Sequence, residues 1–223
     1  MAIPGALYLA GVFLAAAGLL GLHHRRRIDR GRDYRIGIAL LLLVTIAFDM
    51  LGERTVRDEL TASKAARLVS GRKDVSVRCI GWFSMDRLVN SSAEGWVQFD
   101  ADGHASKLAT VDSGQCRTFR TFVSGGKVDV KTATAVVIVV HESVHLSGVT
   151  DEADTQCRAM AAIPKVLTSF GRDAGVAVEV VNAYMQNVYP YMPDAYRRPD
   201  QCRPELAAAG LKLVLGRAGS ERD

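Results

Sequence analysis

Two histidines and a glutamate in one short segment of this chain could do metal chemistry. The segment reads His141-Glu142-Ser143-Val144-His145 in a sequence of 223 residues. On a helix, positions i and i+4 share one face, so His141 and His145 can present two imidazole nitrogens to one ion. Glu142 lies about 100° around that helix from His141, where it can reach a water held on the ion. We therefore predict a zinc (Zn²⁺) site with the two histidines as ligands and Glu142 as the catalytic base.

The same short pattern also occurs on solvated helices whose histidines bind nothing. Three neighbouring features favour the metal site here. An apolar run leads into it at residues 135–140, Gly148 follows His145 by three residues, and acidic residues come immediately after. The other histidines lie in a basic segment near the N-terminus and in a predicted hairpin turn, where neither would contribute.

A catalytic zinc usually has three protein ligands and an open fourth position. The candidates for the third ligand are Asp151, Glu152 and Asp154, although acidic residues in the first turn of a helix also stabilise its dipole. A tight turn at Gly148 would send the next helix back antiparallel and bring its first turn level with His145. We predict Glu152 as the third ligand, with Asp151 as the next candidate.

The segment from His141 to Glu152 resembles the zincin metallopeptidases, in particular the compact gluzincin type, in which a glutamate on the following helix completes the site. The pattern HESVHLSGVTDEADTQCRAM, with a later Tyr196 and Cys202-Arg203, also resembles membrane-anchored actinobacterial proteins with this motif. The resemblance is close over residues 135–160 and loose over 75–205. It implies zinc binding and hydrolysis of peptide bonds.

Two features depart from the gluzincin pattern. Glu152 follows the second histidine by only seven residues, closer than is usual in that group. Asp151 also fits the metzincin spacing HExxHxxGxxD, yet no convincing Met-turn follows. Zinc binding is therefore the firmer of the two expectations.

Two apolar runs near the N-terminus predict a membrane anchor. Residues 2–22 carry no charge and are long enough for a helix that crosses the hydrocarbon core. Residues 36–52 are at the short end of a span, and a buried or interfacial helix is the alternative. The basic residues between the runs are Arg25, Arg26, Arg27, Arg30, Arg32 and Arg35.

These arginines place the loop of residues 23–35 in the cytoplasm by the positive-inside rule. We therefore predict a two-pass protein of the cell membrane, with everything after residue 52 extracytoplasmic and the lipid bilayer as a partner. The net charge of +4 is concentrated in this loop, which argues against a nucleic-acid partner.

All four cysteines follow the apolar runs, and none forms a CxxC pair, which argues against a zinc ribbon or a thioredoxin-like motif. An even number in an exported domain indicates two disulfides, although four cysteines allow three pairings. We predict Cys79–Cys116 and Cys157–Cys202, because each would tie a strand or helix to the next irregular segment. The alternative, four buried thiols, would fit a cytoplasmic domain better.

The hydrophobic pattern after the anchor predicts an α+β protein, in which a mainly helical zincin-like domain (75–223) carries a small β-sheet. Residues 53–74 are expected to form a stalk helix and linker, because Val56, Leu60 and Leu68 fall at helical spacing. Strands are expected at about 75–79, 96–99 and 105–111, with a turn at 100–103.

Four helical patterns and an extended tail complete the predicted domain. A short helix spans about 116–123, and the metal-site helix runs from Thr132 or Thr134 to Ser147. The next begins at Thr150 as N-cap, ends near residue 170 and has a kink before Pro164. A fourth covers about 174–189, and the proline-rich tail of residues 190–204 should be extended.

These features predict a membrane-tethered zinc endopeptidase that acts on extracytoplasmic protein or peptide substrates. The hairpin of residues 96–111 could offer an edge strand to an extended substrate. Tyr189, Tyr191 or Tyr196 could supply an oxyanion donor, although packing of the tail is the use we expect of each. The alternative is a zinc-stabilised surface domain that binds a protein partner without hydrolysis.

Overall fold

The computed structural model describes residues 54–81 and 94–211 of the chain. The described residues from Arg57 onward form one compact unit. Both apolar runs and the basic loop that predict the membrane anchor lie outside the described residues. Within those residues, no helix is both long enough and apolar enough to span a bilayer.

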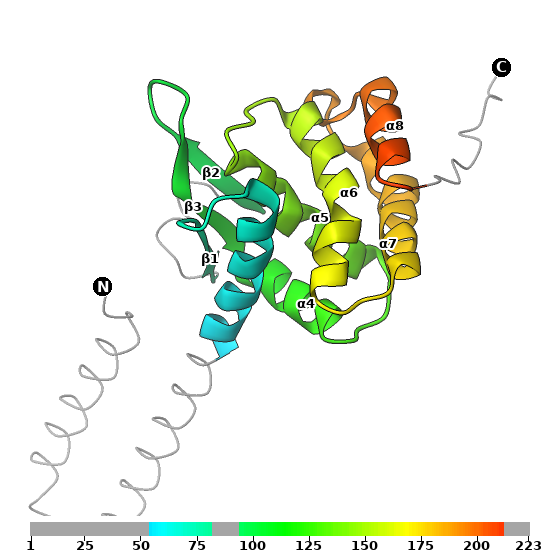
Figure 1. Cartoon of the computed structure of the whole chain (residues 1–223), viewed down its shortest axis with the longest axis horizontal. Coiled ribbons are helices and arrows are strands. Elements are labelled where there is room, and N and C mark those ends of the chain that lie inside the picture. Colours follow the sequence, from blue (N-terminus) through cyan, green and yellow to red (C-terminus); the bar gives the residue numbers. More distant parts are fainter. Residues whose placement is uncertain (1–53, 82–93, 212–223) are drawn as a thin grey trace, which may run out of the picture. The chain divides into compact units, whose positions relative to one another are not determined.

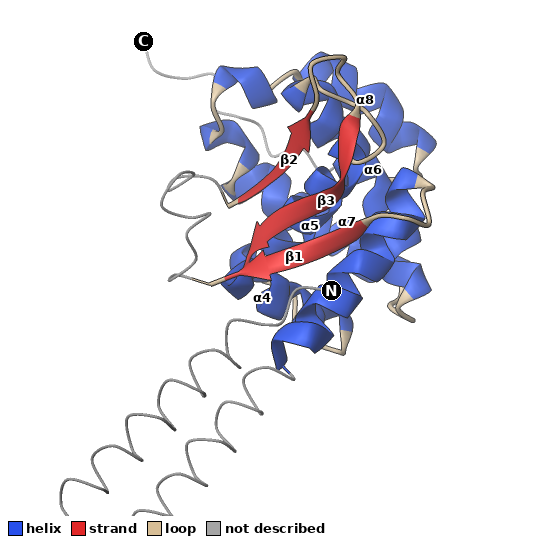
Figure 2. Cartoon of the chain, turned by 90° about the vertical axis from the view of Figure 1, so that its left-hand side faces the viewer, coloured by secondary structure: helices blue, strands red, loops and turns tan. Residues whose placement is uncertain are grey.

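A three-stranded mixed sheet forms one side of the domain (Figure 2). Strand β3 (Ala105–Asp112) lies between β1 (Ser76–Ile80), to which it is parallel, and β2 (Gly95–Phe99), to which it is antiparallel. All three strands were predicted from the sequence. The parallel pairing was not, because β1 and β3 come together only through the tertiary fold.

The helix of residues 54–70 precedes the sheet and was also predicted. The apolar part of its buried face consists of Ala62, Ala65 and Ala66, each fully excluded from solvent. Of the three apolar residues at helical spacing, Leu68 packs against the core, whereas Val56 and Leu60 are 54% and 60% exposed. Small side chains let the helix approach the domain closely, and it shares the hydrophobic core instead of standing apart as a stalk.

The remaining helices pack around one central helix. These are α4 (Ser113–Val123), α5 (Val130–His145), α6 (Glu152–Ser169), α7 (Ala174–Asn187) and α8 (Pro199–Ala208), with short 3-10 turns at Tyr189–Tyr191 and Asp194–Tyr196. Helix α5 contacts the sheet as well as α4, α6 and α7 (Figure 1). The domain is therefore a mostly helical α+β fold, which agrees with the coarse prediction.

The valine-rich run before the histidines is helical, as predicted, even though valine favours strands. Burial on all sides explains the composition, because a helix surrounded by other elements needs no polar face. Its N-cap is Asp129, a few residues earlier than predicted. The Asp129 side chain accepts from the amide of Thr132, and the Thr132 hydroxyl accepts from the amide of Asp129, which completes a capping box.

The tail of residues 190–204 is not extended, and that prediction is wrong. It contains two 3-10 turns and most of α8. Pro199 is the first residue of α8, where a missing N–H costs nothing, so a proline there starts a helix and does not exclude one.

Both predicted disulfides are present. Cys79 of β1 is bonded to Cys116 of α4, and Cys157 of α6 is bonded to Cys202 of α8. The first ties the sheet to the helical layer, and the second holds the C-terminal segment against α6. Because disulfides persist in oxidising compartments, the pair suggests an extracytoplasmic domain.

Candidate metal centre

The centre lies where α5 ends and α6 begins. His145 is the last residue of α5, and the chain reverses through Gly148, whose φ of +99° is accessible to glycine at little cost. Helix α6 then starts at Glu152, with Asp151 as N-cap, one residue later than the predicted Thr150. This short connection holds the first turn of α6 beside the last turn of α5, as the sequence predicted.

Three of the predicted residues converge in this corner. The Nε2 atom of His141 lies 2.9 Å from Oε2 of Glu152, and Nε2 of His145 lies 3.3 Å from the same oxygen. The two Nε2 atoms are 3.0 Å apart. Both imidazoles are buried, and Glu152 is half-buried. This His-His-Glu group could hold a metal ion.

The opposite nitrogen of each ring is held by an oxygen that can only accept a hydrogen bond. Nδ1 of His141 lies 3.0 Å from the amide oxygen of Gln156, and Nδ1 of His145 lies 2.7 Å from the carbonyl of Val149. Each Nδ1 therefore carries a proton, so that in a neutral ring Nε2 is the nitrogen that can accept a hydrogen bond or bind a metal ion. Two lone pairs and a carboxylate oxygen converge, and only a proton or a cation between them relieves the repulsion.

The charge state of Glu152 suits a metal ligand. Burial acts to raise the pKa of the Glu152 carboxyl group, but the adjacent rings of His141 and His145 outweigh that effect and lower the pKa to about 2. Burial lowers the pKa of His141, which favours the neutral ring. Two imidazole nitrogens and one carboxylate oxygen are a donor set that zinc prefers.

Glu142 lies beside this group and makes no comparable contacts. Its side chain is buried, and its Oε2 atom has no hydrogen-bond partner among the described residues. Burial raises the pKa of Glu142 to about 8. Burying a carboxyl oxygen without a hydrogen-bond partner costs free energy. The position of Oε2 therefore favours a bound water or ion beside it.

Strand β2 contributes to the centre through a glycine that the sequence analysis missed. A Cβ atom on Gly95 would lie 2.7 Å from Cγ and 2.8 Å from Oε1 of Glu142. Only glycine therefore fits beside the Glu142 carboxyl without a shift. Farther along the same strand, the Phe99 ring meets the His145 ring edge-on at 5.9 Å. A glycine at the start of a strand does not by itself predict the contact between Gly95 and Glu142.

The C-terminal segment supplies one further aromatic ring. Tyr196 lies 5.8 Å from His141 between ring centroids, tilted by 30°. Burial and the nearby carboxylates of Glu152 and Glu142 raise the pKa of its hydroxyl, which stays protonated and able to donate. Tyr189 packs in the tail, as expected, where its hydroxyl accepts from the amide of Arg198 at 3.0 Å. Tyr191 is 84% exposed.

The two alternative acidic ligands have other partners. The Asp151 side chain accepts from the amide of Asp154 and pairs with Arg198 at 3.1 Å. Asp154 pairs with Arg158 at 2.9 Å. The structure does not bring either carboxylate to the two histidine rings.

A second acidic group, Asp100, Asp102 and His104, lies fully exposed in the turn between β2 and β3. There Oδ1 of Asp100 accepts from the amides of Asp102 and His104, so this carboxylate shapes the turn.

Fold and site together define a mostly helical α+β domain with a buried His-His-Glu group on two successive helices. Comparison with protein-family models, with curated proteins and with solved structures found no match to this chain. The functional argument therefore rests on the residues themselves.

Proposed function

We propose that this protein is a membrane-anchored zinc metallopeptidase that hydrolyses extracytoplasmic protein or peptide substrates. The observation that carries the proposal is the convergence of His141, His145 and Glu152, with the unpartnered carboxyl of Glu142 beside them. Three ligands on a rigid helical corner and one free carboxyl are the parts that zinc-dependent hydrolysis needs.

Each residue has a distinct role in this proposal. His141, His145 and Glu152 hold the ion, while Gln156 and the Val149 carbonyl hold the two rings in the right tautomer. A bound zinc ion supplies a Lewis acid and lowers the pKa of water toward neutrality. The charge of a bound zinc ion would lower the raised pKa of Glu142, so that its carboxylate would take the proton from the attacking water and return it to the leaving amine.

A peptide fits the surroundings of the centre better than a small polar substrate. Among the described residues, β2 pairs with β3 on one side only. Gly95 and Phe99 of β2 both face α5, the helix that carries the two histidines. An extended peptide added to the free side of β2 would run past the histidines. The hydroxyl of Tyr196, whose ring lies beside His141, could then donate a hydrogen bond to the carbonyl oxygen of the peptide bond that is cleaved.

The proposed location rests on two further features. The apolar runs and the arginine-rich loop favour a two-pass anchor with the domain outside the cytoplasm. The two disulfides support the same side of the membrane.

The test is metal analysis of the purified full-length chain in detergent, followed by digestion of a peptide library. We expect one zinc per chain, together with cleavage that a chelator abolishes and added zinc restores. Glu142→Gln should keep the zinc and lose cleavage, because an amide cannot act as the base. Full activity of Glu142→Gln would refute the assigned mechanism.

A zinc-stabilised domain that binds a protein partner is the alternative. The near-complete burial of both histidine rings favours it, because structural zinc sites are closed. Zinc bound by the parent chain without any cleavage of the library would support this reading.

A further inference from the structure

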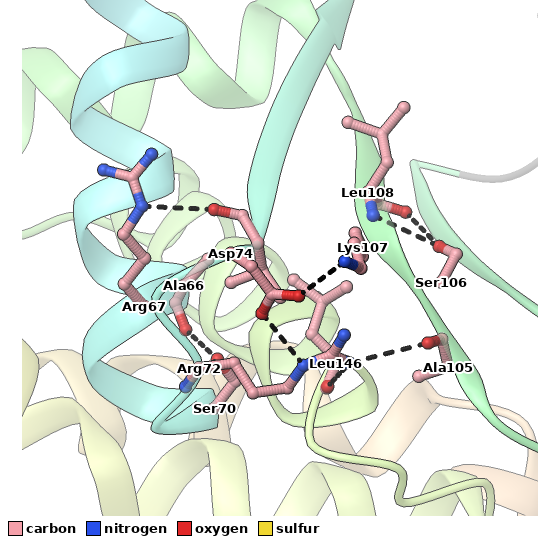
Figure 3. Close-up of polar contacts among 11 residues, drawn as sticks. Ala66, Arg67, Ser70, Arg72, Asp74, Ala105, Ser106, Lys107, Leu108 and Leu146 are labelled. Atoms are coloured by element: carbon pink, nitrogen blue, oxygen red, sulfur yellow. Dashed lines mark hydrogen bonds and ion pairs between the residues drawn. The ribbon is translucent and has the colours of Figure 1, made fainter.

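Arg72 contacts the C-terminal end of α5, the helix that carries His141 and His145, although it lies far from that helix in the sequence. It lies in the loop between the helix of residues 54–70 and β1, and Figure 3 shows its guanidinium reaching toward Leu146 and Ala105. The Nη1 atom of Arg72 donates to the carbonyl of Leu146 at 2.9 Å and, more weakly, to that of Ala105 at 3.5 Å. Leu146 is the C-cap of α5 and directly follows His145.

The Leu146 carbonyl is one of the groups at a helix C-terminus that has no partner within the helix. A cation at this end of a helix is also favoured by the helix dipole. Arg72 supplies both the hydrogen-bond donor and the charge. It therefore holds the last turn of α5 at the point where the chain leaves the helix.

The same turn orients His145. The chain runs from Leu146 to Val149, whose carbonyl accepts from Nδ1 of His145 at 2.7 Å. One end of this four-residue turn is thus held by Arg72, and its other end holds the imidazole. A displacement of Leu146 would move the Val149 carbonyl and, with it, the ring.

The guanidinium of Arg72 is itself held in place. Its Nε atom lies 3.4 Å from Asp74, which in turn pairs with Lys107 of β3 at 3.0 Å (Figure 3). The backbone amide of Arg72 donates to Ser70 at 3.2 Å. These contacts orient the planar guanidinium before any metal binds, so little further ordering is needed.

We propose that Arg72 is a positioning residue for the metal centre, which fixes the C-terminal turn of α5 and through it the ring of His145. The inference rests on the proposed function in requiring that the centre binds metal. It adds a contact that no pattern around the histidines predicts, because Arg72 lies 74 residues before Leu146.

Arg67 offers a matched control. Its Nε atom donates to the carbonyl of Val75 at 3.1 Å, so it also caps a backbone carbonyl from the same region of the chain. That bond does not involve α5. Arg72→Met and Arg67→Met therefore each remove a guanidinium that donates to backbone carbonyls, and only Arg72 donates to α5, at Leu146.

The experiment compares full-length parent, Arg72→Met, Arg72→Lys and Arg67→Met by zinc competition against a chelator and by the visible spectrum of the cobalt-loaded protein. We expect Arg72→Met to weaken zinc binding on the order of tenfold, the lower end of the range for outer-shell partners, and to change the cobalt spectrum. Arg72→Lys should recover part of the affinity, and Arg67→Met should match the parent in both readouts.

Equal zinc affinity and identical cobalt spectra for Arg72→Met and Arg67→Met would overturn the inference while leaving the proposed function intact. Failure of the parent to bind either metal would instead refute the proposed function, and the inference with it. If Arg72→Met does not fold, Arg72→Lys decides, since a lysine cannot reproduce the guanidinium fork. Parent-like affinity and spectrum in Arg72→Lys would then count against the inference.

Discussion

Oxygen Oε2 of Glu152 lies 2.9 Å from Nε2 of His141 and 3.3 Å from Nε2 of His145, so a single atom of α6 meets both rings of α5. Removing this carboxylate tests whether Glu152 is a metal ligand or only an acidic residue that stabilises the first turn of α6. Removing a true ligand leaves two imidazoles, whereas removing a first-turn acid costs only about 0.3–1 kcal/mol and leaves the metal in place.

We therefore expect Glu152→Ala to lose zinc to a competing chelator that the parent withstands. Asp154→Ala should keep the zinc, because that carboxylate pairs with Arg158. Asp151→Ala should also keep it, at a stability cost of about 0.5–2 kcal/mol for the lost N-cap. Zinc titration of the three variants measures the difference. An empty site in Asp151→Ala alone would show that the metzincin-like spacing is the correct one.

Tyr196 gives a second prediction at this scale. Tyr196→Phe keeps the ring against His141 and removes only the hydroxyl beside Glu152 and Glu142. If that hydroxyl donates to the developing oxyanion, kcat should fall on the order of 100-fold with KM and zinc affinity nearly unchanged. Tyr191→Phe, at an exposed position, is the control. Equal kcat for the two variants would assign Tyr196 to packing alone.

The grouping of the three side chains could be predicted from the sequence, because the spacing of His141 and His145 on a helix sets their direction without knowledge of the fold. The short connection to α6 made the approach of Glu152 predictable for the same reason. Gln156 and Gly95 were not predictable. Their roles depend on which atoms the folded chain places beside them, and neither residue type signals that.

Strand β2 and helix α5 meet where Gly95 leaves room for the Glu142 carboxyl. We expect Gly95→Ala to displace that carboxyl, because its Cβ would lie within 2.9 Å of three Glu142 atoms. The variant should keep zinc, lose most hydrolysis and cost about 1–3 kcal/mol of stability as an overpacked site.

Gly81→Ala is the matched control, because the nearest atom to its Cβ would be Ser113 Oγ at 4.0 Å. Thermal unfolding and peptide cleavage of both variants check the prediction. Parent-like cleavage by Gly95→Ala would mean that Glu142 can move without loss of function, and the contact with β2 would then have no catalytic role.

The elements were largely predictable where one periodicity was unambiguous, as in β3 and α7. The errors arose where tertiary context decided. In the helix of residues 54–70 the sequence did not indicate that Ala62, Ala65 and Ala66 would be buried in the core of the domain, because alanine alone gives little apolar signal. In the tail, Pro199 starts α8, and the proline-rich composition had favoured an extended chain.

For the whole molecule, the buried carboxyl of Glu142 links folding stability to pH when no metal is bound. Its pKa is raised from 4.5 to about 8, so the folded state binds this proton more tightly than the unfolded chain. The resulting stabilisation is fully present below pH 4.5 and is lost as the pH rises through about 8.

We expect the metal-free parent to lose stability relative to metal-free Glu142→Gln across this pH window, by at most roughly 5 kcal/mol. Denaturant unfolding of both proteins between pH 4.5 and 8.5 measures the difference. Taking the difference between the two proteins cancels the titrating groups that do not interact with Glu142. Parallel stability curves would show that Glu142 is ionised at ordinary cost in the folded state.

The central claim is that His141, His145 and Glu152 together bind zinc. X-ray absorption at the zinc edge of the loaded full-length protein tests it most directly. The account predicts one zinc per chain with only nitrogen and oxygen ligands at about 2.0–2.2 Å, two of them imidazoles. A sulfur ligand at about 2.3 Å, or a zinc ion coordinated by water alone, would contradict it.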